Sequence, residues 1–344
     1  MGKIALFIAG DERIYFPALV ALLSIKKHNP GVFDLFMCFD KSKLTIEMKE
    51  SLLENEIYFI DNQALEEFDV ERSFSVMSEG KWPIEVFYNY VLPVHLGNMG
   101  YEFSIKADYD ILCTSPYILD EIVPTGKTLG GLCSKVDIVK EGVTQKALDL
   151  LRTQGRFREQ ISDYMNVGFI TFNNKKYIEN DCYKKFIEIY RFLAENTPQA
   201  KLLEQIAFSV LLYELKGDYI KVPESYNHRV LWTRAVQNDL TFDTKNIHYI
   251  TQFKPWKPIE LDKLKWFLHR NNGCLFSYRN LWLEFAEALP NFALHCEERR
   301  LSELQLAGLQ MFIVKNSNER VYKLEKELRE VKAALAATEA AKAK

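Results

Sequence analysis

The first half of the chain alternates short apolar runs with segments of helical spacing. The apolar runs are residues 3–9, 32–39 and 57–60, and the helical segments are residues 17–27 and 44–53. Pro17 suits the start of the first helix, and Asn29-Pro30-Gly31 suits its end. This rhythm predicts an α/β fold of the Rossmann-like kind, in which helices flank both faces of a parallel or mixed sheet.

The same patterns continue as far as Trp256 and then change. Further strands are expected near 101–107, 129–134, 167–173, 219–223 and 246–250, and further helices over 83–95, 177–194 and 199–215. Residues 259–315 have mainly helical spacing. We therefore expect a first domain over 1–258, a helical extension over 259–316 and a separate last helix over 317–344.

The last helix has the apolar seam of a short coiled coil. The seam positions, spaced three and four apart, are Val321, Leu324, Leu328, Val331 and Leu335. In a parallel pair Arg320 would meet Glu325, and Glu327 would meet Lys332, so both charge contacts are attractive. The alternative is a solvated amphipathic tail, because the pattern is shorter than three to four heptads. We favour self-association into a homo-oligomer.

Composition excludes several classes of function. A net charge of −3 with mixed signs argues against nucleic acid as a partner, which needs a clustered positive surface. Six scattered cysteines form no Cys-x-x-Cys pair, which disfavours a zinc ribbon and fits a reduced, cytoplasmic compartment. No apolar run approaches the roughly 20 residues of a membrane-spanning helix, and the run at residues 3–9 is too short for a signal peptide.

Candidate chemistry lies in Asp108, Asp110 and, far downstream, His248 and Lys254. Strand alternation would place both aspartates on one side, where they suit a hard divalent cation carrying a diphosphate. A histidine adds a nitrogen ligand, and a lysine adds charge for phosphate oxygens. Alone, each has a structural explanation: a solvated strand end, a hydrogen-bonded histidine, or a turn around a buried Trp256. Their joint occurrence favours a site for a nucleotide diphosphate.

Four stretches of residues 3–256 together resemble family 8 glycosyltransferases, the group that holds bacterial lipopolysaccharide galactosyltransferases and glucosyltransferases, and glycogenin. The stretches are Ala9-Gly10-Asp11, Asp108-Tyr109-Asp110, Tyr164-Met165-Asn166-Val167-Gly168-Phe169-Ile170, and His248-Tyr249-Ile250-Thr251-Gln252-Phe253-Lys254-Pro255-Trp256. The last is the most specific, because the family has the same five-residue gap between the histidine and the lysine. A weaker match is Glu204-Gln205, where the family often has an acid before a glutamine.

The resemblance implies a GT-A fold and a retaining, manganese-dependent transfer of a hexose from a UDP-sugar. The acceptor would be a saccharide of a surface glycan, glycolipid or glycoprotein, and peripheral contact with the inner face of the membrane stays open. By resemblance the metal ligands are Asp108, Asp110 and His248, the donor-binding residues are Ala9, Asp11, Tyr15, Asp108 and Lys254, and the residues around the transferred sugar are Asn166, Glu204 and Gln205.

The chain departs from the family pattern in ways that leave the donor sugar open. Glu12-Arg13-Ile14 follow Asp11, where the family has an aromatic residue, and residues 87–90 contain no arginine. Glu204 stands where the family usually has aspartate. Two other classes of function remain: a sugar-phosphate nucleotidyltransferase, although residues 9–13 hold one glycine only, and a non-catalytic scaffold assembled through the last helix.

Overall fold

The computed structural model divides the chain into two compact units, each described here by itself. The first unit holds residues 1–229 and 240–250, and the second holds residues 230–239 and 251–344. The residues described are 2–68, 70, 84–159, 161–197, 200, 202–230, 243–250, 254–257, 274–290, 292, 311, 315 and 318–332.

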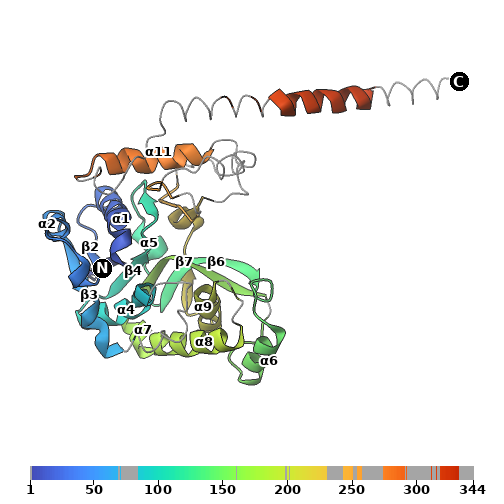
Figure 1. Cartoon of the computed structure of the whole chain (residues 1–344). Coiled ribbons are helices and arrows are strands. Elements are labelled where there is room, and N and C mark those ends of the chain that lie inside the picture. Colours follow the sequence, from blue (N-terminus) through green and yellow to red (C-terminus); the bar gives the residue numbers. More distant parts are fainter. Residues whose placement is uncertain are drawn as a thin grey trace. The chain divides into compact units, whose positions relative to one another are not determined.

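A mixed sheet forms the centre of the first unit (Figure 1). Within the described residues it has seven strands in the order β3-β2-β1-β4-β7-β6-β8. Strands β3, β2, β1 and β4 are parallel, β7 is antiparallel to both β4 and β6, and β8 is parallel to β6. The strands are β1 Ile4–Ala9, β2 Asp34–Phe39, β3 Ile57–Asp61, β4 Phe103–Ala107, β6 Leu129–Asp137, β7 Ile161–Asn173 and β8 Tyr219–Lys221.

Helices cover both faces of this sheet. Ala5, Phe7 and Ala9 point to one face, where they share a core with side chains of α4, α6, α8 and α9. Leu6 and Ile8 are buried on the opposite face, where α1 packs against β1 and β5. The helices are α1 Tyr15–His28, α2 Ile46–Glu54, α4 Tyr88–Asn98, α5 Leu119–Ile122, α6 Gln145–Thr153, α7 Asn174–Glu179, α8 Cys182–Asn196 and α9 Leu203–Glu214, with short 3-10 helices at Glu12–Ile14, Lys41–Lys43, Asn62–Phe68, Ile84–Phe87 and Glu224–Asn227.

A small second sheet joins distant parts of the first unit. It has the order β5-β10-β9, formed by Ile111–Cys113, Asn246–His248 and His228–Arg229. Strand β10 is antiparallel to β5, with His248 opposite Ile111. The backbone N–H of Tyr249 donates to the carbonyl of Asp110 at 2.8 Å. This pairing brings residue 248 beside the loop that follows β4.

The strands and helices predicted between residues 3 and 250 are present in the described residues, with bounds shifted by a few positions and three larger differences; most of the helical segment predicted over 259–315 lies outside the described residues. The helix predicted over 177–194 is two helices, because Asp181 between α7 and α8 has a left-handed backbone conformation with φ 50°. Strand β7 begins at Ile161, six residues before the predicted start. Residues 108–110 form a turn and do not extend β4, so the expected alternation of Asp108 and Asp110 along a strand is wrong.

The second unit is described only in segments. Helix α11 spans Cys274–Glu287, and the ring centroid of Trp282 in this helix lies 5.3 Å from that of Trp256. Residues 318–332 are helical. The side chains of Val321, Leu324, Leu328 and Val331 are each more than half exposed in the single chain, and Leu335 lies outside the described residues. The predicted helical pairing stays a prediction.

Candidate functional site

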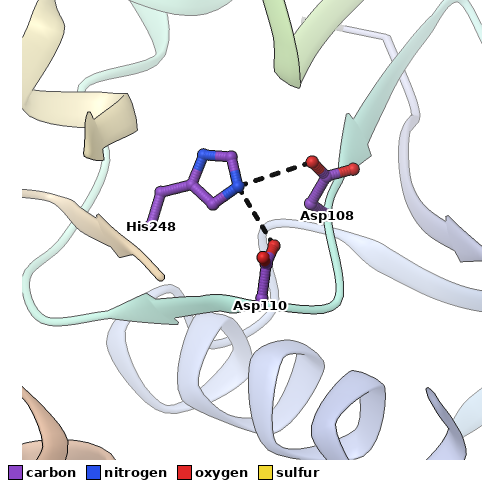
Figure 2. A group of neighbouring side chains, drawn as sticks. All are labelled: Asp108, Asp110 and His248. Atoms are coloured by element: carbon purple, nitrogen blue, oxygen red, sulfur yellow. Dashed lines mark ion pairs between the residues drawn. The ribbon is translucent and has the colours of Figure 1, made fainter. Parts of the chain in front are cut away.

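The turn between β4 and β5 holds two carboxylates opposite a histidine (Figure 2). His248 Nε2 lies 3.0 Å from Asp110 Oδ1 and 3.5 Å from Asp108 Oδ2. Each of the three residues offers one ligand atom, and these three atoms all lie within 4.8 Å of one another. The backbone N–H of Asp108 donates to the carbonyl of Gly168 on β7 at 2.8 Å, which fixes the start of the turn.

A buried lysine compensates the first carboxylate. Lys106 lies on β4, and its Nζ donates to the carboxylate of Asp108 and to the carbonyl of Val167. Burial by itself raises the pKa of Asp108, but the charges of Lys106 and His248 outweigh burial, so the pKa is lowered. Asp108 is therefore held as a carboxylate, the form that binds a cation.

Asn227 fixes the orientation of the His248 ring. His248 Nδ1 lies 2.7 Å from Asn227 Oδ1, and Asn227 Nδ2 donates to Asn166 Oδ1 at 2.7 Å. Because the amide oxygen of Asn227 faces the ring, Nδ1 carries the proton and Nε2 faces the carboxylates. Burial lowers the pKa of His248, but Asp110 and Asp108 outweigh burial and raise it. Gly168 allows this position, because a Cβ there would lie 2.2 Å from His248 Cε1.

A chain of amides connects the histidine to the residues expected around a sugar. Asn166 Oδ1 also accepts from the backbone N–H of Gly168 at 3.0 Å, and Asn166 Nδ2 donates to Gln205 Oε1 at 3.4 Å. Gln205 lies in the first turn of α9 and is buried. The structure thus brings Asn166 and Gln205 together, and the hydrogen bonds run from Gln205 to His248.

Glu204 is a buried carboxyl next to Gln205 on α9. Burial raises its pKa to about 7; Lys106 opposes this rise and Asp108 adds to it. The pKa of Glu204 therefore depends on Asp108, one of the two aspartates of the turn, and on Lys106 just before it. Its carboxyl is partly protonated near neutral pH.

The expected nucleotide-binding residues lie at the carboxyl end of β1, next to β4 in the sheet. Ala9 is the last residue of β1. The carboxylate of Asp11 caps the following 3-10 helix and accepts from Arg13 Nε at 3.0 Å. Tyr15 is buried, and its hydroxyl donates to the carbonyl of Met48 at 3.0 Å. The role of each in nucleotide binding stays a prediction.

Lys254 belongs to the second unit. Its Nζ lies 6.0 Å from the ring centroid of Trp256, a cation–π distance. Its contact with a phosphate stays a prediction.

Three residues of the site were missed in the sequence. Lys106 falls within the strand predicted near 101–107, and its signal is a charge at a buried strand position, which needs a partner. Asn227 sits at the end of a 3-10 helix with no motif around it. Tyr109 lies in the turn itself; burial first, then Asp110, Asp108 and Asp11, raise its pKa. Asp11 is therefore close enough to the turn to contribute to the raised pKa of Tyr109.

The donor set fits a divalent metal. Two carboxylates and an imidazole nitrogen suit a metal that accepts mixed oxygen and nitrogen ligands, such as manganese. His248 Nδ1–H donates its hydrogen bond to Asn227 Oδ1, so Nε2 is the nitrogen available to a metal.

The mixed sheet with flanking helices matches the GT-A fold of solved glycosyltransferases. The sequence profile described as Glycosyl transferase family 8 matches residues 5–260, and the chain belongs to this family of glycosyltransferases. The predicted family and fold class are confirmed. A comparison with curated proteins finds no match.

Three solved structures illustrate the likeness. The bifunctional glycosyltransferase WbbM, in its apo form, has a TM-score of 0.58 and 15% identity over 88% of this chain and 52% of WbbM. The galactosyltransferase LgtC, solved with donor and acceptor sugar analogs, has a TM-score of 0.53 and 14% identity over 84% of this chain and 96% of LgtC. Mouse xyloside xylosyltransferase 1 has a TM-score of 0.51 and 14% identity over 72% of this chain and 98% of its own. The chain spans about half the length of WbbM.

Among the described residues, no helix is both long and apolar enough to cross a membrane.

Proposed function

We propose that the chain transfers a hexose from a UDP-sugar to a saccharide acceptor, with a divalent cation, manganese first among the candidates, at Asp108, Asp110 and His248. The acceptor is a surface glycan, a glycolipid or a glycoprotein. The observation that carries the proposal is the approach of His248 Nε2 to Asp110 and Asp108, at 3.0 and 3.5 Å, inside a family 8 fold. When bound, a cation would neutralise the charge that builds on the leaving diphosphate.

The residues around the cation divide the remaining work. Ala9, Asp11 and Tyr15 bind the nucleoside, and Lys254 contributes charge to a phosphate oxygen. Asn166 and Gln205 position the transferred sugar, because their hydrogen bonds tie them to the ring of His248. These assignments follow the motifs and the contacts described above.

The reaction proceeds with retention of the anomeric configuration. The acceptor hydroxyl attacks the anomeric carbon on the face that the diphosphate leaves, so one C–O bond forms as another breaks. The hydroxyl proton passes to the leaving phosphate oxygen. Glu204 supports this route, because its raised pKa leaves the carboxyl partly protonated near neutral pH and so favours hydrogen bonding over nucleophilic attack.

The proposal is tested with a panel of sugar nucleotides, a panel of saccharide acceptors and manganese, reading nucleotide release and the linkage formed. We expect release of the nucleotide from a UDP-hexose. The glycosidic linkage of the product should have the same anomeric configuration as the donor. Asp110→Asn keeps the side-chain shape and should remove turnover, whereas Asp149→Ala, which removes an exposed carboxylate of α6, should not. Full turnover of Asp110→Asn, or release from no sugar nucleotide by the native chain, contradicts the proposal.

We further propose that the chain has three structural parts, residues 1–258, 259–316 and 317–344. The last part would pair with the same part of other copies to form a homo-oligomer. Support comes from the exposed apolar seam of the helix at 318–332. Cytoplasmic action is supported by the free cysteines of the described residues, which are Cys38, Cys113, Cys133 and Cys182.

A further inference from the structure

A cavity separate from the carboxylate–histidine site opens in the first unit. It has a volume of about 750 Å³ and lies between the strands β6, β7 and β8, the C-terminal end of α9 and the loop after α6. Its lining shares no residue with the site described above. The two approach each other along α9, where Gln205 belongs to the site and Ser209, one helical turn later, belongs to the cavity.

The lining carries more positive than negative charge. Five cations, Lys135, Arg156, Arg158, Lys185 and Lys216, face three carboxylates, Glu159, Asp163 and Glu214, a surplus of two. Two of the carboxylates are already paired. Asp163 lies 2.9 Å from the Nζ of Lys221, and Glu214 lies 2.7 Å from Arg156 Nε. Among the described residues, Arg158, Lys185 and Lys216 have no carboxylate partner, so their charge is available to a ligand.

One hydroxyl in the lining is buried without a hydrogen bond. Ser162 on β7 is 3% exposed, and its Oγ has no partner among the described residues. A buried hydroxyl without a partner is unfavourable, because it loses its hydrogen bonds to water on folding. Its position in the wall of the cavity gives a ligand both a donor and an acceptor.

The rest of the wall suits a hydroxylated ligand. Tyr213 and Tyr219 contribute ring surface and phenolic oxygens, and the hydroxyl of Tyr219 is held by Asp163 at 2.5 Å. The volume lies within the range of about 300–1,000 Å³ of small-molecule sites and exceeds the need of a single phosphate ion.

We infer that this cavity binds a saccharide that carries a phosphate or carboxylate group. The anionic group meets the unpaired cations, and the sugar hydroxyls meet Ser162 and the tyrosines. This binding is independent of the proposed transfer reaction, because the cavity contains none of the candidate metal ligands.

Calorimetry on the full chain, with chelator present to keep metal from the carboxylate–histidine site, tests the inference. The probes are glucose 6-phosphate, glucuronic acid, glucose and inorganic phosphate. We expect saturable binding of one or both anionic sugars, binding of inorganic phosphate at least tenfold weaker, and none of glucose; the stronger of the two sugars identifies the anionic group. Lys185→Ala should weaken binding at least tenfold, the effect of one lost charge-assisted contact, and Ser162→Ala should weaken it severalfold, the effect of one lost neutral hydrogen bond.

Two controls separate this result from a change in charge or fold. Lys184→Ala removes an exposed cation next to Lys185 on α8 that does not line the cavity, and it should bind as the native chain does. Ser162→Ala should also be at least as stable to urea as the native chain, since it removes a hydroxyl without a partner. The inference is overturned if neither anionic sugar saturates, if glucose or phosphate binds equally well, or if Lys185→Ala and Ser162→Ala behave like Lys184→Ala.

Discussion

Asn227 offers a direct test of how the site is held together. Its side chain accepts from His248 and donates to Asn166, each at 2.7 Å, in a fully buried position. Asn227→Ala leaves the Nδ1–H of His248 buried without its acceptor. An unsatisfied buried donor costs about 1–3 kcal/mol. A metal-binding histidine uses one ring nitrogen for the metal and donates a hydrogen bond from the other. Losing the acceptor of that hydrogen bond lowers metal affinity about 10–100-fold. The energy cost and the loss of metal affinity are of similar size, because a tenfold change in affinity corresponds to about 1.4 kcal/mol.

The assay is manganese affinity, measured by calorimetry and by the electron paramagnetic resonance signal of the free ion, with urea unfolding in parallel. Asn227→Asp separates the two contacts, because aspartate still accepts from His248 but donates nothing to Asn166. We expect Asn227→Asp to keep manganese affinity within a few fold and to lose turnover. Asn180→Ala removes a donor to Thr128 at 2.8 Å outside the site and controls for loss of an amide.

Asn227 does not hold the metal site if Asn227→Ala binds manganese as tightly as the native chain does while unfolding at lower urea. In that case Asn227 would contribute to stability alone. If the native chain itself binds no manganese, the proposed metal site fails as well.

Chelation should abolish turnover reversibly, with manganese restoring it best; undiminished turnover in chelator would contradict a metal role. Lys254→Ala should weaken UDP binding by about 1.5–3 kcal/mol in calorimetry, the value of a hydrogen bond to a charged group, and unchanged affinity would remove Lys254 from the site. Glu204 has its pKa raised from 4.5 to about 7, so the folded state holds a proton that the unfolded state releases, and stability falls as pH rises between these values. Glu204→Gln, studied without metal, should flatten that slope, worth roughly 3 kcal/mol at most, and a slope equal to that of the native chain would place the titration elsewhere. Deleting residues 317–344 should shift the mass in light scattering towards the monomer and spare transfer, whereas a full chain that is monomeric at high concentration would refute pairing.

Local periodicity predicted most of the fold. The runs at β1, β2 and β3 and the helices between them were readable, because side-chain alternation and helical spacing are properties of a few neighbouring residues. The break between α7 and α8 was not readable, since it depends on the left-handed backbone of Asp181, a residue with no strong preference for that conformation.

The three predicted metal ligands lie close together, but not through the geometry that was expected. Asp108 and Asp110 were identified correctly as neighbours of His248, but a turn brings them together where strand alternation was expected. The pairing of β5 with β10 joins residues far apart in the chain, which local patterns do not encode. Asn227 escaped notice for the same reason, because its partners lie 21 and 61 positions away.

The pairing of β5 with β10 also sets when the site can exist during synthesis. A growing chain that ends before Asn246 already contains every strand of the large sheet, from β1 to β8. It contains Asp108 and Asp110 but not His248. Contacts of such long sequence separation form late, because the intervening chain must first be ordered. A nascent chain thus presents two carboxylates with no imidazole opposite, and the proposed metal site would be complete only after translation has passed β10.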